Sequence, residues 1–141
     1  MNAEIEKALA ITPASRARDR TIDITTTGAR TRRPRRIEVW FYRVDGQIYL
    51  STQPARRSWY ANILKNPSFT FHLKHGVRAD LPAVGTPVRD PRRRELVFRS
   101  IIADLNQPWN PAGIPQPVEP LEDWMEGSPL VHVDFTEGTD S

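Results

Sequence analysis

A chain of 141 residues with 38% hydrophobic and 26% charged residues is long enough for one domain with a buried core, and this balance excludes a disordered chain. The absence of cysteine excludes disulfides, thiolate metal sites and cysteine nucleophiles, and no apolar run approaches the ~20 residues of a membrane helix. All 20 Lys and Arg lie in residues 1–105, whereas residues 106–141 contain acids and no base, so a net charge of +3 combines a basic region with an acidic one.

The N-terminal residues predict a helix followed by a connector. Apolar residues recur at helical spacing in Ala3–Ile11, and Thr12-Pro13 ends the pattern. Residues 14–20 are polar, so we interpret residues 1–19 as a helix and its connector. The first residues lack the basic start and apolar run of a signal peptide, and we therefore expect a cytoplasmic protein.

Short runs of alternating apolar and polar residues predict about six strands. Asp45-Gly46 is typical of a tight hairpin turn between two of them. A bulge is expected in the fifth strand, near Pro82 or Gly85. The expected strands are Arg20–Thr27, Arg36–Arg43, Gln47–Thr52, Phe69–Lys74, Arg78–Arg89 and Leu130–Phe135.

Three further segments have helical patterns. Ser58–Lys65 is expected to begin with Ser58 as its cap. Asp90–Leu105 has Asp90 at the cap position and Pro91 after it, and Leu121–Glu126 is expected to be a short helix. The apolar stripe expected on the second of these helices is Leu96, Val97, Ile101, Ile102 and Leu105.

Contiguous strands with few helices favour a mainly β fold of the α+β class. We expect a small split or closed β-barrel of about six mostly antiparallel strands, with helices on its outside. Residues 1–141 would form one domain, with a proline-rich loop region at 106–129 and a C-terminus that frays.

Several kinds of catalytic site are excluded by their missing patterns. The serines have no G-x-S-x-G setting, and His72, His75 and His132 have no spacing that marks a base or a metal ligand. No second glycine follows Gly28 at the spacing of a phosphate-binding loop. We therefore predict no metal site, and the sequence identifies no catalytic residue.

Two arginine-rich loops remain as candidates for binding. Five arginines lie within residues 30–36, and Arg56 and Arg57 precede the helix at Ser58, whose first N–H groups favour an anion. If the strands pair as expected, both loops lie at one rim of the barrel. The alternatives are a solvated basic surface or a nucleic-acid interface, and the acidic C-terminal region argues against the latter.

The segment from Thr25 to Lys74 resembles the deazaflavin-dependent nitroreductase family, within the flavin and deazaflavin oxidoreductases. The resemblance comes from T-T-G, a basic residue two positions on, proline followed by arginine, an aromatic strand, and the run WYANILKNP. Two positions depart from the family pattern, since Ala29 replaces a usual basic residue and Arg32 stands where glycine is common. The resemblance implies a split barrel like that of the FMN-binding pyridoxamine-phosphate oxidases.

It also implies binding of coenzyme F-420, a deazaflavin with a phosphate and an oligoglutamate tail. The phosphate and tail would be held by Arg30, Thr31, Arg35 and Arg36. The ring's edge would lie along Ile37, Glu38, Val39 and Trp40. Further cofactor contacts would come from Ser51, Thr52, Gln53, Ser58, Trp59 and Asn62.

We therefore expect an F-420-dependent reductase that transfers a hydride to a small electrophile such as a quinone, enone or nitroaromatic. Tyr42, Tyr60 or water would supply the proton. The alternatives are an FMN-, FAD- or haem-binding protein of the same fold, or a carrier of the cofactor without catalytic activity. We also expect a homodimer that has no nucleic-acid partner and no integral membrane segment.

Overall fold

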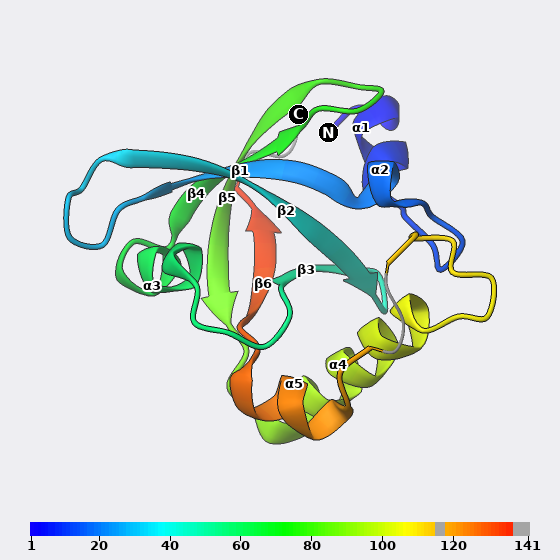
Figure 1. Ribbon diagram of the computed structural model, residues 1–141. Coiled ribbons are helices and arrows are strands. Elements are labelled where there is room, and N and C mark those ends of the chain that lie inside the picture. Colours follow the sequence, from blue (N-terminus) through cyan, green and yellow to red (C-terminus); the bar gives the residue numbers. More distant parts are fainter. Residues whose placement is uncertain (115–117, 137–141) are drawn as a thin grey trace.

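The chain folds into a closed barrel of six antiparallel strands, seen in a computed structural model that describes residues 1–114 and 118–136 (Figure 1). Around the barrel the strands follow the order β1-β2-β3-β6-β5-β4, and β4 pairs with β1 to close it. The strands are β1 (Thr21–Thr27), β2 (Pro34–Val44), β3 (Gln47–Ser51), β4 (Ser68–Leu73), β5 (Ala79–Pro87) and β6 (Leu130–Phe135).

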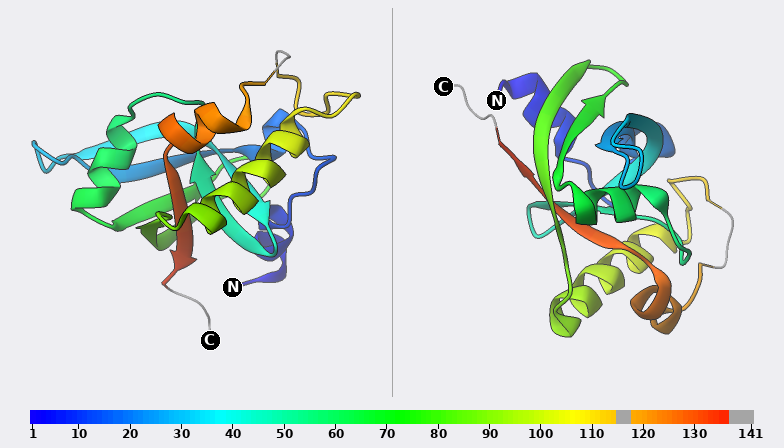
Figure 2. Two further views of the ribbon diagram at one scale, coloured as in Figure 1. Left: turned by 90° about the horizontal axis from the view of Figure 1, so that it is seen from below. Right: turned by 90° about the vertical axis from the view of Figure 1, so that its left-hand side faces the viewer.

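Five helices of the described residues flank the barrel, and the predicted antiparallel barrel with outer helices is confirmed. Figure 2 shows α4 and α5 lying together on one side, while α3 lies beside the projecting hairpin of β1 and β2. No helix in residues 1–114 and 118–136 has the length and apolar content needed to cross a membrane. The helices are α1 (Ala3–Leu9), α2 (Ala17–Arg20), α3 (Ser58–Lys65), α4 (Pro91–Leu105) and α5 (Leu121–Gly127).

The barrel has two apolar cores, one on each face of its strands. Because side chains alternate along a strand, Val39 and Phe41 of β2 point inward, where they pack with Ile24 of β1, Phe71 of β4 and residues of the three remaining strands. The next residue, Tyr42, points outward and packs with Tyr49, under α4 and α5. The second core explains why the aromatic outer face of β2 and β3 is not wetted, and it positions α4 beside the groove described below.

The turn and cap chemistry expected from the sequence is largely confirmed. Asp45 and Gly46 have φ of 52° and 75°, as a two-residue hairpin turn requires. Asp90 caps α4 by accepting a hydrogen bond from the Arg93 N–H at 2.9 Å. The Ser58 cap is wrong, because α3 begins after Arg57 and has no side-chain cap.

The bulge expected in β5 is also wrong. Pairing runs without interruption from Leu73↔Ala79 to Ser68↔Val84 on one edge of β5, and from Ala83↔Phe135 to Pro87↔Val131 on the other. Gly85 serves a different purpose, since a Cβ there would lie 2.8 Å from Val131 Cγ1 and 2.9 Å from Ile63 Cγ2. The glycine allows α3 and β6 to pack directly against the β5 backbone.

Two details of the helices differ from expectation. Residues 14–20 are not only a connector, because they include α2 and end at the buried Arg20, so β1 begins one residue later at Thr21. On α4, Leu96 is exposed and Phe98 takes its place in the core. The predicted fraying concerns the last residues, and 137–141 lie outside the part of the chain described.

An ionic cluster on the outer face of β1 and β2 makes stability depend on pH. Burial alone would raise the pKa of Asp23, but hydrogen bonds from Lys74 at 2.7 Å and Arg36 at 3.0 Å outweigh it and lower that pKa. The hydrogen bond to Asp23 and, to a smaller extent, the one to Glu38 raise the pKa of Lys74. The cluster therefore stabilises the fold between the unfolded-state values of about 3.9 and about 10.4.

We expect Asp23→Asn to lower stability at pH 7 and to have little effect in acid. A lowered carboxyl pKa contributes stability above its unfolded value, and this contribution is lost as pH falls through the folded value. The difference between the urea unfolding midpoints of the two proteins, measured from pH 3 to pH 8, should therefore be largest above about pH 4 and begin to shrink below it. A constant difference across that range would show that charge at Asp23 does not matter.

Candidate functional site

The loop between β1 and β2 closes through its own backbone. The Gly28 N–H donates to the Arg33 carbonyl at 2.8 Å, and the Arg32 N–H donates back to the Gly28 carbonyl at 3.0 Å. A Cβ on Gly28 would lie only 2.5 Å from Thr31 Oγ1, the atom that accepts from the Arg33 N–H. The tight turn thus favours glycine at position 28, because a Cβ would displace Thr31 Oγ1 from its contact with the Arg33 N–H.

Arg32 has a φ of 60°, in the left-handed region that favours glycine. The resemblance described above has glycine commonly at this position, so the arginine found here adopts a strained conformation that glycine would adopt easily. We expect Arg32→Gly to stabilise the fold by up to about 1 kcal/mol, because relief of strain exceeds the added unfolded-state entropy. Chemical denaturation measures this change, and a destabilised variant would contradict it.

Helix α3 supports this loop through Asn62. Its Oδ1 accepts from the Ala29 N–H at 2.9 Å, and its Nδ2 donates to Thr26 Oγ1 at 3.0 Å. The side chain is buried, so both ends of the amide are used by the protein. Asn62 therefore fixes the loop against α3, and the two basic loops lie at the same rim, as the sequence predicted.

Between the loop and the start of α3 lies a groove of about 550 Å³, which we call the anion groove. Three guanidinium groups that line it, those of Arg30, Arg35 and Arg56, have no ion-pair partner among the described residues. The uncapped first turn of α3 adds free N–H groups. The lining consists of Gly28, Ala29, Arg30, Thr31, Arg35, Arg56, Arg57, Ser58, Ala61 and Asn62.

A second groove of about 290 Å³ adjoins the first, and we call it the apolar groove. The two share Arg57, whose Nη2 donates to the Gln53 carbonyl at 3.1 Å. Arg57 Nε and Thr52 Oγ1 are buried without a hydrogen-bond partner among the described residues. The lining consists of Glu38, Val39, Trp40, Tyr42, Ser51, Thr52, Gln53, Arg57, Leu105 and Ile114.

Most residues predicted for the site line one of these grooves. The anion groove contains Arg30, Thr31, Arg35, Ser58 and Asn62, and the apolar groove contains Glu38, Val39, Trp40, Ser51, Thr52 and Gln53. Three lie elsewhere: Arg36 pairs with Asp23, Ile37 lines neither groove, and Trp59 is buried in the barrel core.

Some lining residues were not among the predicted contacts. Arg56 and Arg57 lie just before α3, and this position beside a helix N-terminus was the sequence feature that indicated anion binding. Tyr42, Leu105 and Ile114 could not be inferred, because they meet the groove only through tertiary packing. Burial raises the pKa of Tyr42, which keeps its hydroxyl protonated but makes it a poor proton donor. Tyr60 packs against the barrel core and lines neither groove.

A Thr–His–Asp chain crosses the outer face of β1, β4 and β5. His72 Nε2 lies 2.7 Å from Thr25 Oγ1, and its Nδ1 lies 2.7 Å from Asp80 Oδ1. The hydrogen bond from His72 lowers the pKa of Asp80. The residues line neither groove, so we interpret the chain as a polar ladder between strands rather than a nucleophilic site.

The six-stranded closed barrel with flanking helices is a fold that solved flavin-binding proteins share. The sequence profile described as F420H(2)-dependent quinone reductase matches residues 13–107, which is more than half of the chain. The chain belongs to this family of oxidoreductases, and the expected kinship with deazaflavin-dependent enzymes is confirmed. No curated protein matches the chain in sequence.

Solved structures with low sequence identity share the fold. A conserved hypothetical protein from Mycobacterium tuberculosis is 20% identical with a TM-score of 0.62, over 97% of this chain and 82% of that one. An FAD-binding protein from Mesorhizobium loti is 13% identical with a TM-score of 0.62, over 97% of this chain and 91% of that one. A pyridoxamine 5'-phosphate oxidase-related, FMN binding protein from Nostoc punctiforme is 15% identical with a TM-score of 0.60, over 95% of this chain and 79% of that one. The predicted barrel class is confirmed.

Proposed function

We propose that this protein binds coenzyme F-420 across the two grooves and reduces a small electrophile with it. The observation that supports this most strongly is the junction at Arg57, where a groove lined by arginines meets a mainly apolar one. A ligand that suits both must have a flat apolar part joined to a strongly anionic part. F-420 has this construction, and the family of the chain uses it.

In the anion groove, Arg30, Arg35 and Arg56 would hold the phosphate and the tail carboxylates. Their guanidinium groups have no competing ion pairs among the described residues, and bidentate contacts to such oxygens suit arginine. Thr31 and Ser58 add hydroxyl groups at the same groove. Asn62 would act through the loop, since its own amide is already bonded.

In the apolar groove, the side chain of Trp40 on β2 would contact the ring; Val39 also lines this groove, although its side chain belongs to the barrel core. The buried, unpartnered Thr52 Oγ1 and Arg57 Nε fit a ligand with hydrogen-bonding groups at its edge, because an orphaned buried polar atom is costly. The reduced cofactor, when bound, supplies the hydride. The protein orients it, and solvent provides the proton that the acceptor needs, because the raised pKa of Tyr42 makes this tyrosine a poor donor.

The proposed acceptors are quinones, enones and nitroaromatics. Oxidation of reduced F-420 by a panel of these compounds, followed by absorbance, tests the proposal. Turnover with at least one class is expected. Tight F-420 binding without turnover would favour a cofactor carrier, and a protein that purifies coloured with FMN, FAD or haem would contradict the cofactor assignment.

We also propose a homodimer with no nucleic-acid partner. Sedimentation at micromolar concentrations checks the first part. Binding to single-stranded DNA that weakens steeply with salt would contradict the second, because it would show that the arginines meet a phosphate backbone.

A further inference from the structure

One wall of the apolar groove comes from a segment that the family profile does not cover. The profile ends at residue 107, and residues 108–114 follow α4 as a loop. Ile114 of this loop and Leu105 of α4 line the groove, whereas the other lining residues lie between positions 38 and 57. The loop therefore completes a groove whose remaining walls come from β2, β3 and the start of α3.

The base of this loop is anchored to the body of the protein. Gln107 Nε2 donates to the Pro13 carbonyl at 2.6 Å and to the Asp104 carbonyl at 2.8 Å. Asp104 itself holds the buried Arg20. Figure 1 shows the loop beside the connector that follows α1, as these contacts require. The wall thus starts from a fixed point.

The far end of the loop is held by Asn110. Its Nδ2 donates to the Ile114 carbonyl at 2.6 Å, and its Oδ1 accepts from the Ile114 N–H at 3.1 Å. The Gly113 N–H also donates to the Asn110 carbonyl at 2.9 Å, and both residues have positive φ, of 69° and 44°. Ala112 is buried in the outer core between them. A single side chain therefore fixes both backbone groups of Ile114.

Ile114 and Leu105 offer only hydrocarbon side chains to the groove. The two buried polar atoms of the groove that have no partner among the described residues, Thr52 Oγ1 and Arg57 Nε, lie on the opposite wall, between the end of β3 and the start of α3. A ring held by those atoms and by the anion groove leaves its other side to the α4 and loop wall. With the ring in that position, the molecule that accepts the hydride would enter between this wall and the ring.

We propose that Ile114 limits the size of the acceptor and that Asn110 is a positioning residue that holds Ile114 in place. The inference rests on the proposed function and extends it to the choice of substrate. Truncating Ile114 should admit bulkier acceptors, since each methylene in an apolar pocket changes discrimination about 10-fold or more. Loss of the Asn110 contacts should relax the same limit without touching the cofactor.

The test compares a bulky naphthoquinone with benzoquinone. For Ile114→Ala we expect the ratio of their kcat/KM values to shift at least 10-fold toward the bulky acceptor, and for Asn110→Ala at least 3-fold. The F-420 dissociation constant should stay within 2-fold. In the double variant, Asn110→Ala should add nothing to Ile114→Ala. Asn110→Asp, which keeps the acceptor for the Ile114 N–H, should recover part of the wild-type ratio.

The inference would be overturned if the ratio of kcat/KM values for the two quinones stayed unchanged in both single variants. It would also be overturned if the shift in this ratio came with a loss of F-420 affinity. The same ratio measured as quinone dissociation constants, by tryptophan quenching, needs no cofactor. If the variants shift the ratio of quinone dissociation constants but no protein oxidises F-420, the proposed function is contradicted and the role of Ile114 in limiting acceptor size is supported. Turnover without any shift would contradict the wall alone.

Discussion

Reversing the charges of Arg30 and Arg35 together is expected to weaken F-420 binding by more than 100-fold. Both side chains line the anion groove and have no ion-pair partner among the described residues, so they are available to the phosphate and tail. Each charge-assisted hydrogen bond contributes about 1.5–3 kcal/mol, and glutamates at both positions add repulsion. Isothermal calorimetry of Arg30→Glu/Arg35→Glu measures the loss.

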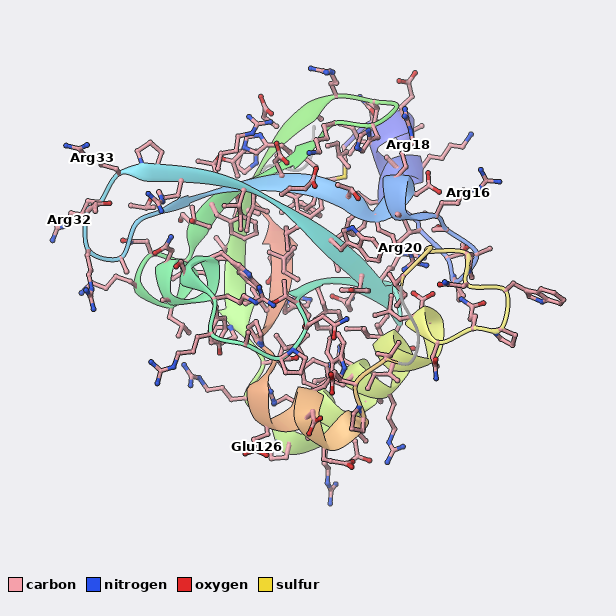
Figure 3. The ribbon with its side chains drawn as sticks, viewed as in Figure 1. Arg16, Arg18, Arg20, Arg32, Arg33 and Glu126 are labelled. Carbon is pink, nitrogen blue, oxygen red and sulfur yellow. The ribbon has the colours of Figure 1, made fainter. Side chains whose placement is uncertain are left out.

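The matched control is Arg32→Glu/Arg33→Glu on the same loop. Figure 3 shows both side chains at the tip of the β1–β2 hairpin, directed away from the barrel, and neither lines the groove. The control changes the net charge by the same amount. Because long-range electrostatic effects are screened at physiological salt, it should lower the F-420 affinity by less than 10-fold. Equal losses in both variants would contradict a local site. Circular dichroism should show both variants folded.

Asp104→Ala is expected to destabilise the fold by about 3–5 kcal/mol, because it leaves a buried guanidinium without its counter-charge. The Arg20 side chain is fully buried, and its two Nη atoms donate to Asp104 at 2.6 and 2.9 Å. The backbone carbonyls of Ser15, Thr12 and Pro13 also accept hydrogen bonds from Arg20, at 3.2, 3.0 and 3.4 Å. The melting temperature should fall by on the order of 10 °C.

Glu95→Ala, on the same helix, is the control. Glu95 pairs with Arg99 one turn along α4, and both side chains are largely exposed, so its loss should cost less than about 1 kcal/mol. Replacing both partners of the buried pair with apolar residues, in Arg20→Met/Asp104→Leu, should recover much of the stability lost in Asp104→Ala. A small effect of Asp104→Ala would show that Arg20 reaches solvent in solution.

The fold could largely be predicted because its local patterns agree with its tertiary structure. Inward residues of β2 and β4 alternate as a barrel wall requires, Asp45-Gly46 fixes one hairpin, and Asp90 followed by Pro91 marks the start of α4. The misplaced features depend on partners distant in sequence. Local sequence places Arg20 in a polar connector, because the residue that neutralises its buried charge, Asp104, lies 84 positions away.

The candidate site was predictable at its strand and helix ends but not in its packing. Arginines near Gly28 and before α3 indicated an anion groove, and antiparallel pairing brings them to one rim. Trp59 turned inward because α3 packs over the barrel, and Asn62 was needed to hold the loop. The wall made by Leu105 and Ile114 depends on where α4 lies, which periodicity alone does not determine.

The most direct test of the central claim is an equilibrium titration of the purified protein with F-420, followed by cofactor fluorescence, beside a parallel titration with FMN. Two grooves joined at Arg57 should bind F-420 with a micromolar or lower dissociation constant, and binding should weaken as salt is raised, because arginines hold the anionic part. FMN should bind at least 10-fold more weakly. No binding of F-420 alongside clear binding of FMN would contradict the account.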